Sequence, residues 1–538
     1  MRGPVLLLVA CLLASACLET TPPVPSPDPA DPNGEITTVA AGEPDTIDPQ
    51  KESFASEIAH TMMVFEPLLS FDPRTLQPIP AAARALPAVS EDGLTVTFAL
   101  RDGQVYSDGA PVTASDFVYG WKRLCDPNVS GDFAFAGYVI AGCERWNEMD
   151  PKRASLDDLG AARNGVGVAA PDATHVVFTL ARPAPYFLAV AALWIGVPVR
   201  ASDLTTGGDH WTEPATFTGN GPFKLTEWKH NERLVFERND RYRAPAKIKR
   251  WTKVIIPDQA VAAAAFRNRE LDVAPADKGA EASVRRSAGL SMYLGFNVVR
   301  PPFDDAAVRM AFARSLDRDA LVRDVIPSPA VPSLTFIAPG LPGANPSDTT
   351  QAFDPAAARA LLAASRYATA IPVIRFTYQP SAERTPVVRW VIAQWRSNLG
   401  VDVLEDPILP WCCSQLIRTP QMRPQLLYLG WSVEYPDPQD WLSTVFRSTS
   451  TITRTSYSSA EFDALVDRAD VERDAAKRLD LYMEAQRVLT RDAPVAFLYS
   501  TEVRYLVSHR LRGYALTASD WEFGQFTLAA MYVAKPGF

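Results

Sequence analysis

Residues 100–124 read LRDGQVYSDGAPVTASDFVYGWKRL, and this stretch decides the fold class of the chain. It continues residues 94–100, where apolar and other side chains alternate as they do in a half-buried strand. Two Asp-Gly turn signals follow. Thr113 with Asp116 three positions later is typical of a helix N-terminus, so a helix is predicted to run to the end of the stretch. A strand, tight turns and a helix therefore follow one another directly.

The same mixture of strands and helices continues through the rest of the chain. Asp354-Pro355 is typical of a helix start, with aspartate at the cap and proline at the first helical position. The mixed order predicts an α/β fold in which helices and sheets form layers, joined by proline-rich connections such as residues 326–346. The predicted strands are 175–180 and 233–237, and the predicted helices are 305–316, 354–364 and 459–490, the last broken near Arg473.

Length and composition are those of a folded protein with two to four domains. The chain has 538 residues, of which 47% are hydrophobic and 21% charged. Beyond its start, no apolar run approaches the roughly 20 residues that a membrane span needs. The formal net charge of −9, with no basic stripe, argues against a nucleic-acid partner.

The N-terminal residues are typical of a secretory signal. Arg2 precedes an apolar run from Val5 to Ala14, and small residues lead up to Cys17. Leu-Ala-Ser-Ala-Cys resembles the bacterial lipobox, in which the cysteine becomes the lipidated N-terminus. The resemblance implies a signal peptide over residues 1–16 and lipidation at Cys17. The alternative is an ordinary cleaved signal followed by a disordered start.

A proline-rich segment follows Cys17 and ends at Gly34. Proline at this density supports neither helix nor sheet, and it favours an extended tether of about 3 Å per residue, on the order of 50 Å in all. We therefore expect a lipid to hold a folded domain beside a bacterial membrane, outside the cytoplasm, on the periplasmic side or the cell surface. The prolines of residues 17–34 are Pro22, Pro23, Pro25, Pro27, Pro29 and Pro32.

Four cysteines remain after the signal and the lipidation site are set aside. Cys125 and Cys143 enclose a loop whose closure by a disulfide would contribute about 3 kcal/mol. Cys412 and Cys413 are adjacent, and a bridge between neighbours is strained. An oxidising compartment permits disulfides, but four cysteines allow three connectivities and the sequence does not choose among them.

Motifs that carry enzyme chemistry or bind metal are absent from the sequence. The five histidines are scattered, without the His-Glu-x-x-His spacing of a metalloprotease, so no metal site is predicted. Neither a Gly-x-Ser-x-Gly elbow nor a Gly-x-x-x-x-Gly-Lys phosphate loop is present. Residues 219–222 resemble a phosphate loop only in their glycines and are read as a turn. The sequence therefore predicts no enzyme and no cofactor.

Six segments in order resemble the oligopeptide- and dipeptide-binding family of bacterial ABC-importer solute receptors. The similarity runs from about residue 36 to the C-terminus, and the chain is identified as a member of that family. The segments are Gly42–Pro49, Phe65–Leu69, Leu100–Leu124, Thr218–Leu225, Asn297–Arg309 with its Pro-Pro-Phe-Asp-Asp, and Gly430–Pro438, which reads GWSVEYPDP.

The resemblance implies a two-lobed periplasmic-binding-protein fold with an extra inserted domain and a hinge between the lobes. Ligand lies between the lobes, which close around it. Lobe I is expected to be discontinuous, and lobe II to be one stretch. The expected boundaries are 35–62, 190–297 and 500–538 for lobe I, 63–189 for the inserted small domain, and 298–499 for lobe II.

The resemblance also implies how a peptide would be held. Its backbone runs extended and pairs with the protein as a strand does. An acidic residue just before an aromatic residue grips the free amine, and here this is Glu434 before Tyr435. The family more often has aspartate there, and glutamate reaches one methylene further. The alternative is that Glu434 is a solvated loop acid, while Asp437 reads as a turn former.

Further ligand contacts are expected from aromatic residues. Trp431 and Trp411 would wall the site, although both could equally be core. Tyr119 lies on a helix at core spacing, so a core role competes with a ligand contact there, as it does for Tyr293. Cys412-Cys413 beside Trp411 departs from the family pattern. The predicted ligand-binding residues are Glu434, Trp431, Gly430, Trp411, Tyr119 and Tyr293.

The function that follows is capture of peptides and delivery to an ABC import permease. The expected partners are the peptide, the permease subunits and the membrane through the lipid, with the receptor acting as a monomer. One alternative is a receptor of the same fold for an oligosaccharide, a metal chelate or a signalling peptide. A more remote alternative is a hydrolase, which reversible binding without turnover would exclude.

Overall fold

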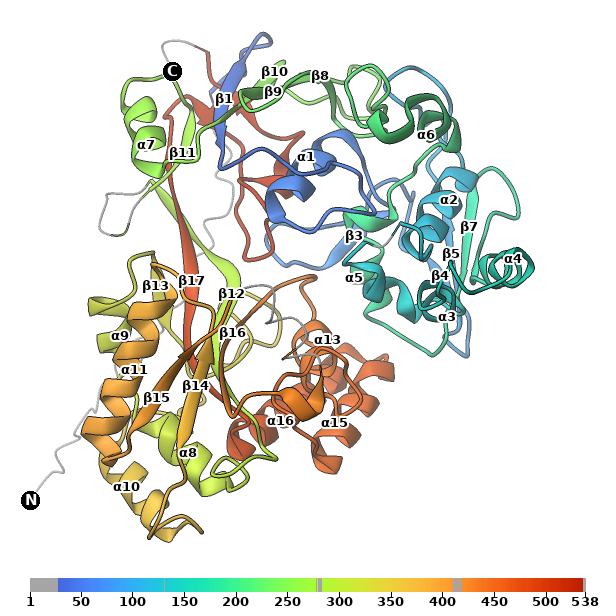
Figure 1. Cartoon of the computed structure of the whole chain (residues 1–538). Coiled ribbons are helices and arrows are strands. Elements are labelled where there is room, and N and C mark those ends of the chain that lie inside the picture. Colours follow the sequence, from blue (N-terminus) through green and yellow to red (C-terminus); the bar gives the residue numbers. More distant parts are fainter. Residues whose placement is uncertain are drawn as a thin grey trace, which may run out of the picture.

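The computed structural model describes residues 28–129, 131–276, 278, 283–409, 416 and 419–535. The predicted signal peptide, Cys17 and most of the tether lie outside these residues. Figure 1 shows an upper lobe and a lower lobe joined by two long strands, β12 and β17, with a smaller body beside the upper lobe. In the described part of the chain no helix is both long and apolar enough to cross a membrane.

One large mixed sheet runs through both lobes. Its strands lie in the order β15-β14-β16-β12-β17-β11-β1-β10-β9-β8, and β13 pairs with β17 beside this path. The strands are β1 (Glu35–Ala40), β8 (Phe223–Lys229), β9 (Arg233–Arg238), β10 (Arg250–Ile255), β11 (Val273–Pro275), β12 (Val284–Phe296), β13 (Ala330–Pro332), β14 (Ile374–Tyr378), β15 (Val403–Pro407), β16 (Leu426–Ser432) and β17 (Val495–Val507).

Strands β12 and β17 connect the lobes because each pairs with a different partner at its two ends. The lower part of β12 pairs with β16, and the upper part of β17 pairs with β11. Between these parts the β12–β17 register shifts, between Ser287 and Ser291. Gly289 lies at this irregularity with a φ of 64°, and a Cβ there would lie 2.4 Å from the backbone oxygen of Ala518. Glycine is required at this position, where the pairing of the two strands that connect the lobes is interrupted.

The upper lobe buries an aromatic core around Trp251, Phe223 and Phe236. The turn at residues 219–222 crosses close to the end of α1, where the Gly221 N–H donates to the Val64 carbonyl at 2.8 Å. The turn predicted for this stretch is therefore present, and it packs on a helix. The elements beside this core are α1 (Ala55–Val64), α6 (Ala201–Gly207) and the strand pair β18 (Leu511–Arg512) with β19 (Tyr532–Val533). Helix α7 (Gln259–Arg267) packs in a separate small cluster, and the strand pair β2 (Leu69–Phe71) with β3 (Pro78–Pro80) contributes to the core of the smaller body.

The lower lobe has its own core around Phe312, Phe296 and Trp395. The predicted helix starts are confirmed, because the carboxylates of Asp305 and Asp354 accept from backbone N–H groups of the first turns of α8 and α10. The predicted connection 326–346 contains one short strand, β13. The helices of this core are α8 (Ala306–Arg314), α9 (Arg318–Asp324), α10 (Pro355–Ala364) and α11 (Arg384–Leu399).

The smaller body, here called the small sheet domain, comprises residues 88–190. The predicted helix of the opening stretch is α2, and the Asp116 carboxylate accepts from the Thr113 N–H at 2.8 Å at its start. Four antiparallel strands lie in the order β4-β5-β7-β6. Its elements are β4 (Ala88–Val89), β5 (Thr95–Ala99), α2 (Ala114–Leu124), α3 (Cys143–Asn147), α4 (Leu156–Asn164), β6 (Val168–Ala169), β7 (His175–Thr179) and α5 (Phe187–Val190).

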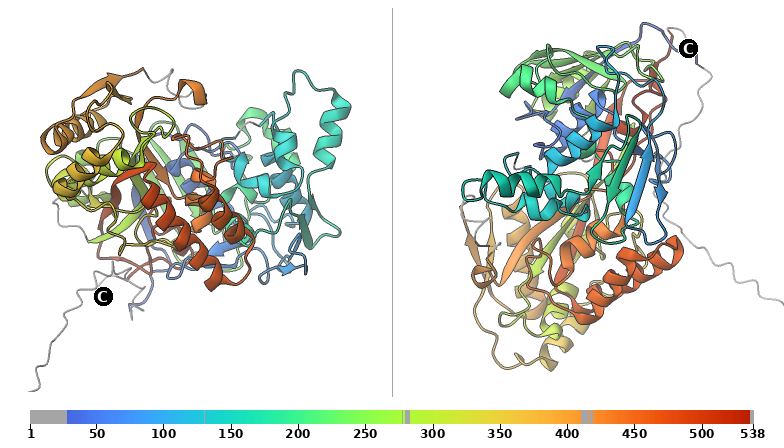
Figure 2. Two further views of the ribbon diagram at one scale, coloured as in Figure 1. Left: turned by 90° about the horizontal axis from the view of Figure 1, so that it is seen from below. Right: turned by 90° about the vertical axis from the view of Figure 1, so that its right-hand side faces the viewer.

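A group of helices, here called the helical group, follows β16 in the chain. It comprises α13 (Pro438–Trp441), α14 (Ser443–Phe446), α15 (Ala460–Val471) and α16 (Ala475–Asp492), and the chain breaks between the last two as predicted. Seen from below in Figure 2, this group lies between the lower lobe and the small sheet domain. One continuous hydrophobic core includes residues of both the helical group and the small sheet domain. The packing therefore joins parts of the chain that are far apart in sequence.

Candidate ligand-binding site

The segment Gly430–Pro438 leaves the large sheet and enters the helical group. Gly430 lies opposite Met292 of β12, and a Cβ on Gly430 would lie 2.7 Å from the Met292 sulfur. The Val433 N–H donates to the carbonyl of Gly289 at 2.8 Å. The segment is therefore anchored on the strand irregularity that joins the two lobes.

The turn after Glu434 is held by a nearly buried ion pair. Both terminal nitrogens of Arg478, on α16, donate to the Asp437 carboxylate at 2.7 Å, and each side chain is 13% exposed. Burial disfavours the charged guanidinium, but the charge of Asp437 outweighs it and holds the pKa of Arg478 above its usual value. Asp437 also caps α13 by accepting from the Gln439 N–H at 2.9 Å. Its role is more specific than that of the turn former predicted from the sequence.

Two carboxyl groups without a cationic partner lie on either side of this turn. Glu434 is partly buried, and its Oε2 is shielded from solvent without a hydrogen-bond partner among the described residues. Asp440 is completely buried, and its Oδ2 accepts from the Glu434 N–H at 3.0 Å. Burial raises the pKa of Glu434 to about 8. Burial, with the charge of Glu434 added, raises the pKa of Asp440 well above its usual value.

Trp431 brings a hydrogen-bond donor to the same place. Its indole Nε1 is shielded from solvent and makes no hydrogen bond of normal geometry within the described part of the chain. It lies near enough to Asp440 to lower the pKa of that carboxyl, against the larger effect of burial. A buried donor without a hydrogen-bond partner costs free energy. The indole N–H can therefore donate to an acceptor on a ligand, or form a closer hydrogen bond to Asp440 after a small movement.

The site lies next to the junction between the helical group and the small sheet domain. The ring of Tyr435 stacks on that of Tyr186, with centroids 6.5 Å apart and planes 9° from parallel. Close by, Arg182 donates to the Asp470 carboxylate at 3.4 Å. Both Tyr186 and Arg182 belong to the small sheet domain, so Glu434 stands beside a contact between separate parts of the chain.

The structure places the two predicted tyrosines in packing environments. Tyr119, on α2, is partly buried and packs against the upper-lobe core. Tyr293, on β12, is 4% exposed and its ring meets that of Phe336 edge-on at 5.3 Å. Burial raises the pKa of the Tyr293 phenol. Neither is brought into hydrogen-bond contact with Glu434, and both remain predictions as ligand contacts.

Of the predicted cysteine features, one pair is described. Cys125 and Cys143 form a disulfide with a Cα–Cα distance of 5.1 Å, joining the end of α2 to the start of α3. Trp411, Cys412 and Cys413 lie outside the described residues.

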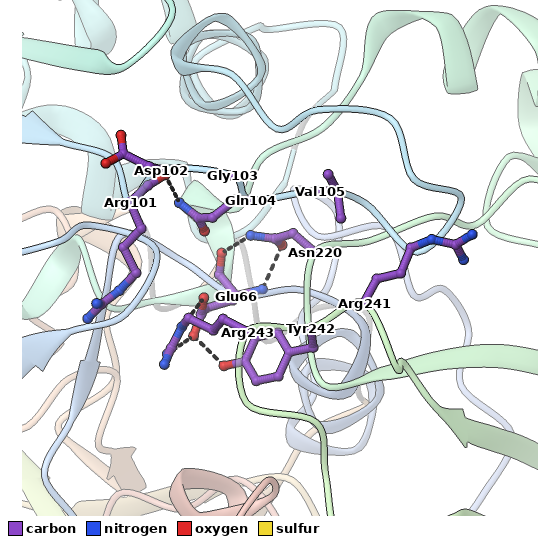
Figure 3. A pocket seen from close by; sticks show the side chains of 10 residues that line it. All are labelled: Glu66, Arg101, Asp102, Gly103, Gln104, Val105, Asn220, Arg241, Tyr242 and Arg243. Atoms are coloured by element: carbon purple, nitrogen blue, oxygen red, sulfur yellow. Dashed lines mark hydrogen bonds and ion pairs between the residues drawn. The ribbon is translucent and has the colours of Figure 1, made fainter.

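A cavity of about 390 Å³ also opens beside the upper lobe, and Figure 3 shows its lining. The Glu66 carboxylate at its centre accepts from the Tyr242 hydroxyl and from the Arg243 guanidinium. The Asn220 side chain bonds the Glu66 backbone at both its oxygen and its nitrogen. These polar groups satisfy one another, which is typical of a structural junction. Glu434 and Asp440 differ because they are left unsatisfied.

Metal chemistry finds no support in the described part of the chain, where no group of three or more His, Cys, Asp or Glu side chains is placed to hold a metal ion. The arrangement at Glu434 offers carboxylates and an indole N–H, which suit a ligand with both donors and acceptors. It can bind a cationic group but presents no nucleophile with an adjacent base.

Asp440 and Arg478 are functional candidates that the sequence did not single out. Asp440 follows the family-like segment by two positions, and its place directly before Trp441 and Leu442 was the available signal. No sequence signal pointed to Arg478, because its partner Asp437 is distant in the chain. Such long-range pairing is visible only after folding.

Comparison with known proteins identifies the family. The family described as "Bacterial extracellular solute-binding proteins, family 5 Middle" matches residues 77–452. The chain belongs to the family-5 solute-binding proteins. Members of this family are binding proteins and not enzymes, and the family is extracytoplasmic. The sequence-based assignment to this family is confirmed.

Relatives of this family-5 protein support the assignment over most of its length. It is 30% identical to the dipeptide-binding protein DppE of Bacillus subtilis, with 81% of each chain covered. It is 30% identical to the periplasmic oligopeptide-binding protein OppA of Salmonella typhimurium, covering 87% of this chain and 86% of the relative. The unliganded open form of the murein tripeptide binding protein MppA superposes with a TM-score of 0.79 at 24% identity, covering 95% and 99%. The predicted two-lobed α/β fold with an extra domain is confirmed.

Proposed function

We propose that this family-5 protein is an extracytoplasmic receptor that captures peptides by their free amino end at Glu434. The ligand class is supported by relatives that are a dipeptide-binding protein and an oligopeptide-binding protein. The observation that carries the site is the shielded Glu434 carboxylate oxygen without a partner among the described residues. It stands on a segment held rigidly by Asp437–Arg478 on one side and by Gly289 on the other.

The physical reason is charge compensation. A carboxylate removed from water is costly unless a cation and hydrogen bonds replace its hydration. Glu434 is not provided with an Arg or Lys partner by the described residues, whereas neighbouring Asp437 is. A peptide ammonium supplies one positive charge and three N–H donors. Glutamate extends one methylene further than aspartate, so the amine would lie further from the backbone of this segment.

Closure of the lobes would complete the site. The segment that carries Glu434 bonds to Gly289, where the strands that connect the lobes change register. A ligand bound at Glu434 therefore touches the lower lobe next to the bend. Approach of the upper lobe would exclude water and strengthen the ion pair, while the small sheet domain already packs beside the site.

The decisive experiment combines ligand identification with one substitution. Mass spectrometry of whatever co-purifies should find peptides. Calorimetry with trialanine and its N-acetylated form should show that acetylation and Glu434→Gln each weaken binding, because truncating one partner of a buried pair costs about 2–5 kcal/mol, roughly 30- to several-thousand-fold.

Two further features of that experiment make it specific. Glu434→Gln should matter little to the acetylated peptide, since the two losses share one interaction. Glu461→Gln, on α15 and exposed beside Arg491, is the matched control and should bind as wild type does. Losses below about threefold from both acetylation and Glu434→Gln would mean that Glu434 is a solvated loop acid.

We further propose that the receptor is a lipid-anchored monomer that passes its ligand to an ABC import permease. Support comes from the lipobox-like sequence ending at Cys17, which lies outside the described residues, and from the family. Cys17→Ala should release the protein from the membrane fraction. Retention of that variant on membranes after a high-salt wash would show that lipid is not the anchor.

A further inference from the structure

The environment of Asp440 is unusual for a carboxyl group in a protein interior. Its side chain is completely buried at the third position of α13, and its Oδ1 finds no hydrogen-bond partner within the described residues. Its Oδ2 is turned toward the Glu434 backbone and accepts that N–H at 3.0 Å. Buried acids that stabilise a fold are normally satisfied, so an unsatisfied oxygen next to a candidate ligand residue calls for another role.

Neighbouring acids show what satisfaction looks like in this part of the molecule. Asp437 is paired with Arg478 through two hydrogen bonds. Asp470 accepts from the hydroxyls of Ser443 and Tyr482, at 2.6 and 2.7 Å, and has Arg182 nearby. The cations of this region are thus committed to Asp437 and Asp470. Within the described part of the chain, Glu434 and Asp440 lie beside each other and neither has an ion pair with a cationic side chain.

A second group at the same place also lacks a partner of normal geometry. The Trp431 indole N–H is shielded from solvent and faces the Asp440 carboxyl, whose pKa it lowers as a hydrogen-bond donor does, but it makes no hydrogen bond of normal geometry within the described residues. An N–H donor beside two carboxyl groups means that unsatisfied groups of both polarities converge. The approach of the indole to Asp440 still leaves Glu434 Oε2 without a donor among the described residues, and a ligand that carries an ammonium next to a carbonyl can satisfy the carboxyl groups and the indole together.

We propose that Asp440 is the second acid of the amine site, that Glu434 and Asp440 share a proton in the free receptor, and that the ligand's ammonium replaces that proton. This inference rests on the proposed function. The carboxyl O–H bond breaks, its proton passes to solvent, and the ammonium donates hydrogen bonds to both carboxylates. No covalent bond to the ligand forms. Asp440 thereby restricts the site to ligands with a cationic end.

The surrounding charges favour retention of a proton before binding. Burial and then the charge of Glu434 raise the pKa of Asp440, and Asp437 adds a smaller rise, while Arg478 is held by Asp437. The small sheet domain contributes Tyr186, whose ring stacks on that of Tyr435, the residue after Glu434. Burial raises the pKa of both phenols, so they stay neutral. Two close carboxyl groups in such surroundings do not both ionise near neutral pH.

The first test needs no ligand. Infrared spectroscopy of the free receptor at pH 7 should show the carbonyl stretch of a buried protonated carboxyl group. In Asp440→Asn the band should change frequency, because the proton is then held by Glu434 alone, and it should vanish in the Glu434→Gln/Asp440→Asn double variant. Absence of the band in the wild type would overturn the proposal whatever the ligand of the receptor is.

The second test counts protons during binding. Calorimetry with trialanine at pH 6.5, in buffers of different ionisation enthalpy, should show net proton release by the wild type. Proton release should persist in Asp440→Asn, because burial keeps Glu434 protonated, but affinity for trialanine should fall roughly 30-fold or more, because the ammonium then meets one carboxylate in place of two. The control is Asp467→Asn, on an exposed ion pair of α15, which should match the wild type.

Equal trialanine affinity of the wild type and Asp440→Asn would show that Asp440 is purely structural. If Asp440→Asn is poorly folded, the infrared band of Glu434→Gln provides the comparison from the other member of the pair, because it needs no ligand; the band should remain and be carried by Asp440. A receptor that shows the infrared band but binds no trialanine would overturn the proposed peptide function, and the proposal for Asp440 with it. These failures are therefore distinguishable.

Discussion

The pair formed by Asp437 and Arg478 should be the strongest single support of the Glu434 segment. Asp437→Ala removes two hydrogen bonds of 2.7 Å between side chains that are 13% exposed, and also the cap on the Gln439 N–H. Breaking a buried ion pair by removing one partner costs about 3–5 kcal/mol, and loss of an N-cap adds about 1 kcal/mol. Among the described residues, the Arg478 guanidinium would then keep hydrogen bonds to the Tyr482 hydroxyl and the Ala469 carbonyl.

Thermal unfolding followed by calorimetry measures this loss. For a cooperative unit of about 200 residues, 4 kcal/mol corresponds to a fall of roughly 10 °C in Tm. The matched control is Glu461→Ala, which breaks an ion pair to Arg491 whose side chains are more than half exposed, and which should cost no more than about 1 kcal/mol. The double variant Asp437→Ala/Arg478→Met should be less destabilised than Asp437→Ala, because no charge is then left buried.

A loss below about 1 kcal/mol for Asp437→Ala would refute this reasoning, as it would place the pair among exposed ion pairs. So would strict additivity in the double variant, since two groups in direct contact must show an interaction energy. Because the pair positions the segment that carries Glu434, trialanine affinity should fall in Asp437→Ala even at temperatures where the variant is folded.

Three other predictions concern stability and motion. Because the pKa of Glu434 is raised from 4.5 to about 8, the native state binds this proton more tightly than the unfolded state. The free energy of unfolding should therefore fall as pH rises from about 4.5 to 8, by at most about 5 kcal/mol. Glu434→Gln should flatten this part of the pH profile of Tm, and an unchanged profile would contradict the prediction. Replacing Cys125 and Cys143 by alanine should cost about 3 kcal/mol, seen as a lower Tm that reducing agent no longer changes, whereas an unaltered Tm would show that the bridge adds nothing. Saturating trialanine should reduce the radius of gyration measured by small-angle scattering. Gly289→Ala should lose more than about 1 kcal/mol of stability and should weaken this closure, because residue 289 has a φ of 64° and its Cβ would be crowded by a backbone oxygen. An equal decrease in the radius of gyration of both proteins would show that Gly289 is not part of the hinge.

Much of the local structure was predictable because it depends on residues close together in the chain. Thr113 with Asp116 predicts the start of α2, and Asp354 before Pro355 predicts the start of α10. A capping side chain forms its hydrogen bond with backbone groups within one helical turn, so both signals are local. The ordered motifs identified the family, and through it the two-lobed fold; the role of Glu434 stays a prediction. The position of the break between α15 and α16 also followed from the pattern near Arg473.

Tertiary structure alone decided which charged groups are compensated and which are not. Arg478 lies 41 positions from Asp437, yet it neutralises that acid and leaves Asp440 and Glu434 without a cation among the described residues. It also joined Cys125 to Cys143, where the sequence left three connectivities open. Hydrophobic periodicity and caps are set by near neighbours in the chain. The cost of burying a charge depends on every group that folding brings within a few ångströms, and the sequence does not state those distances.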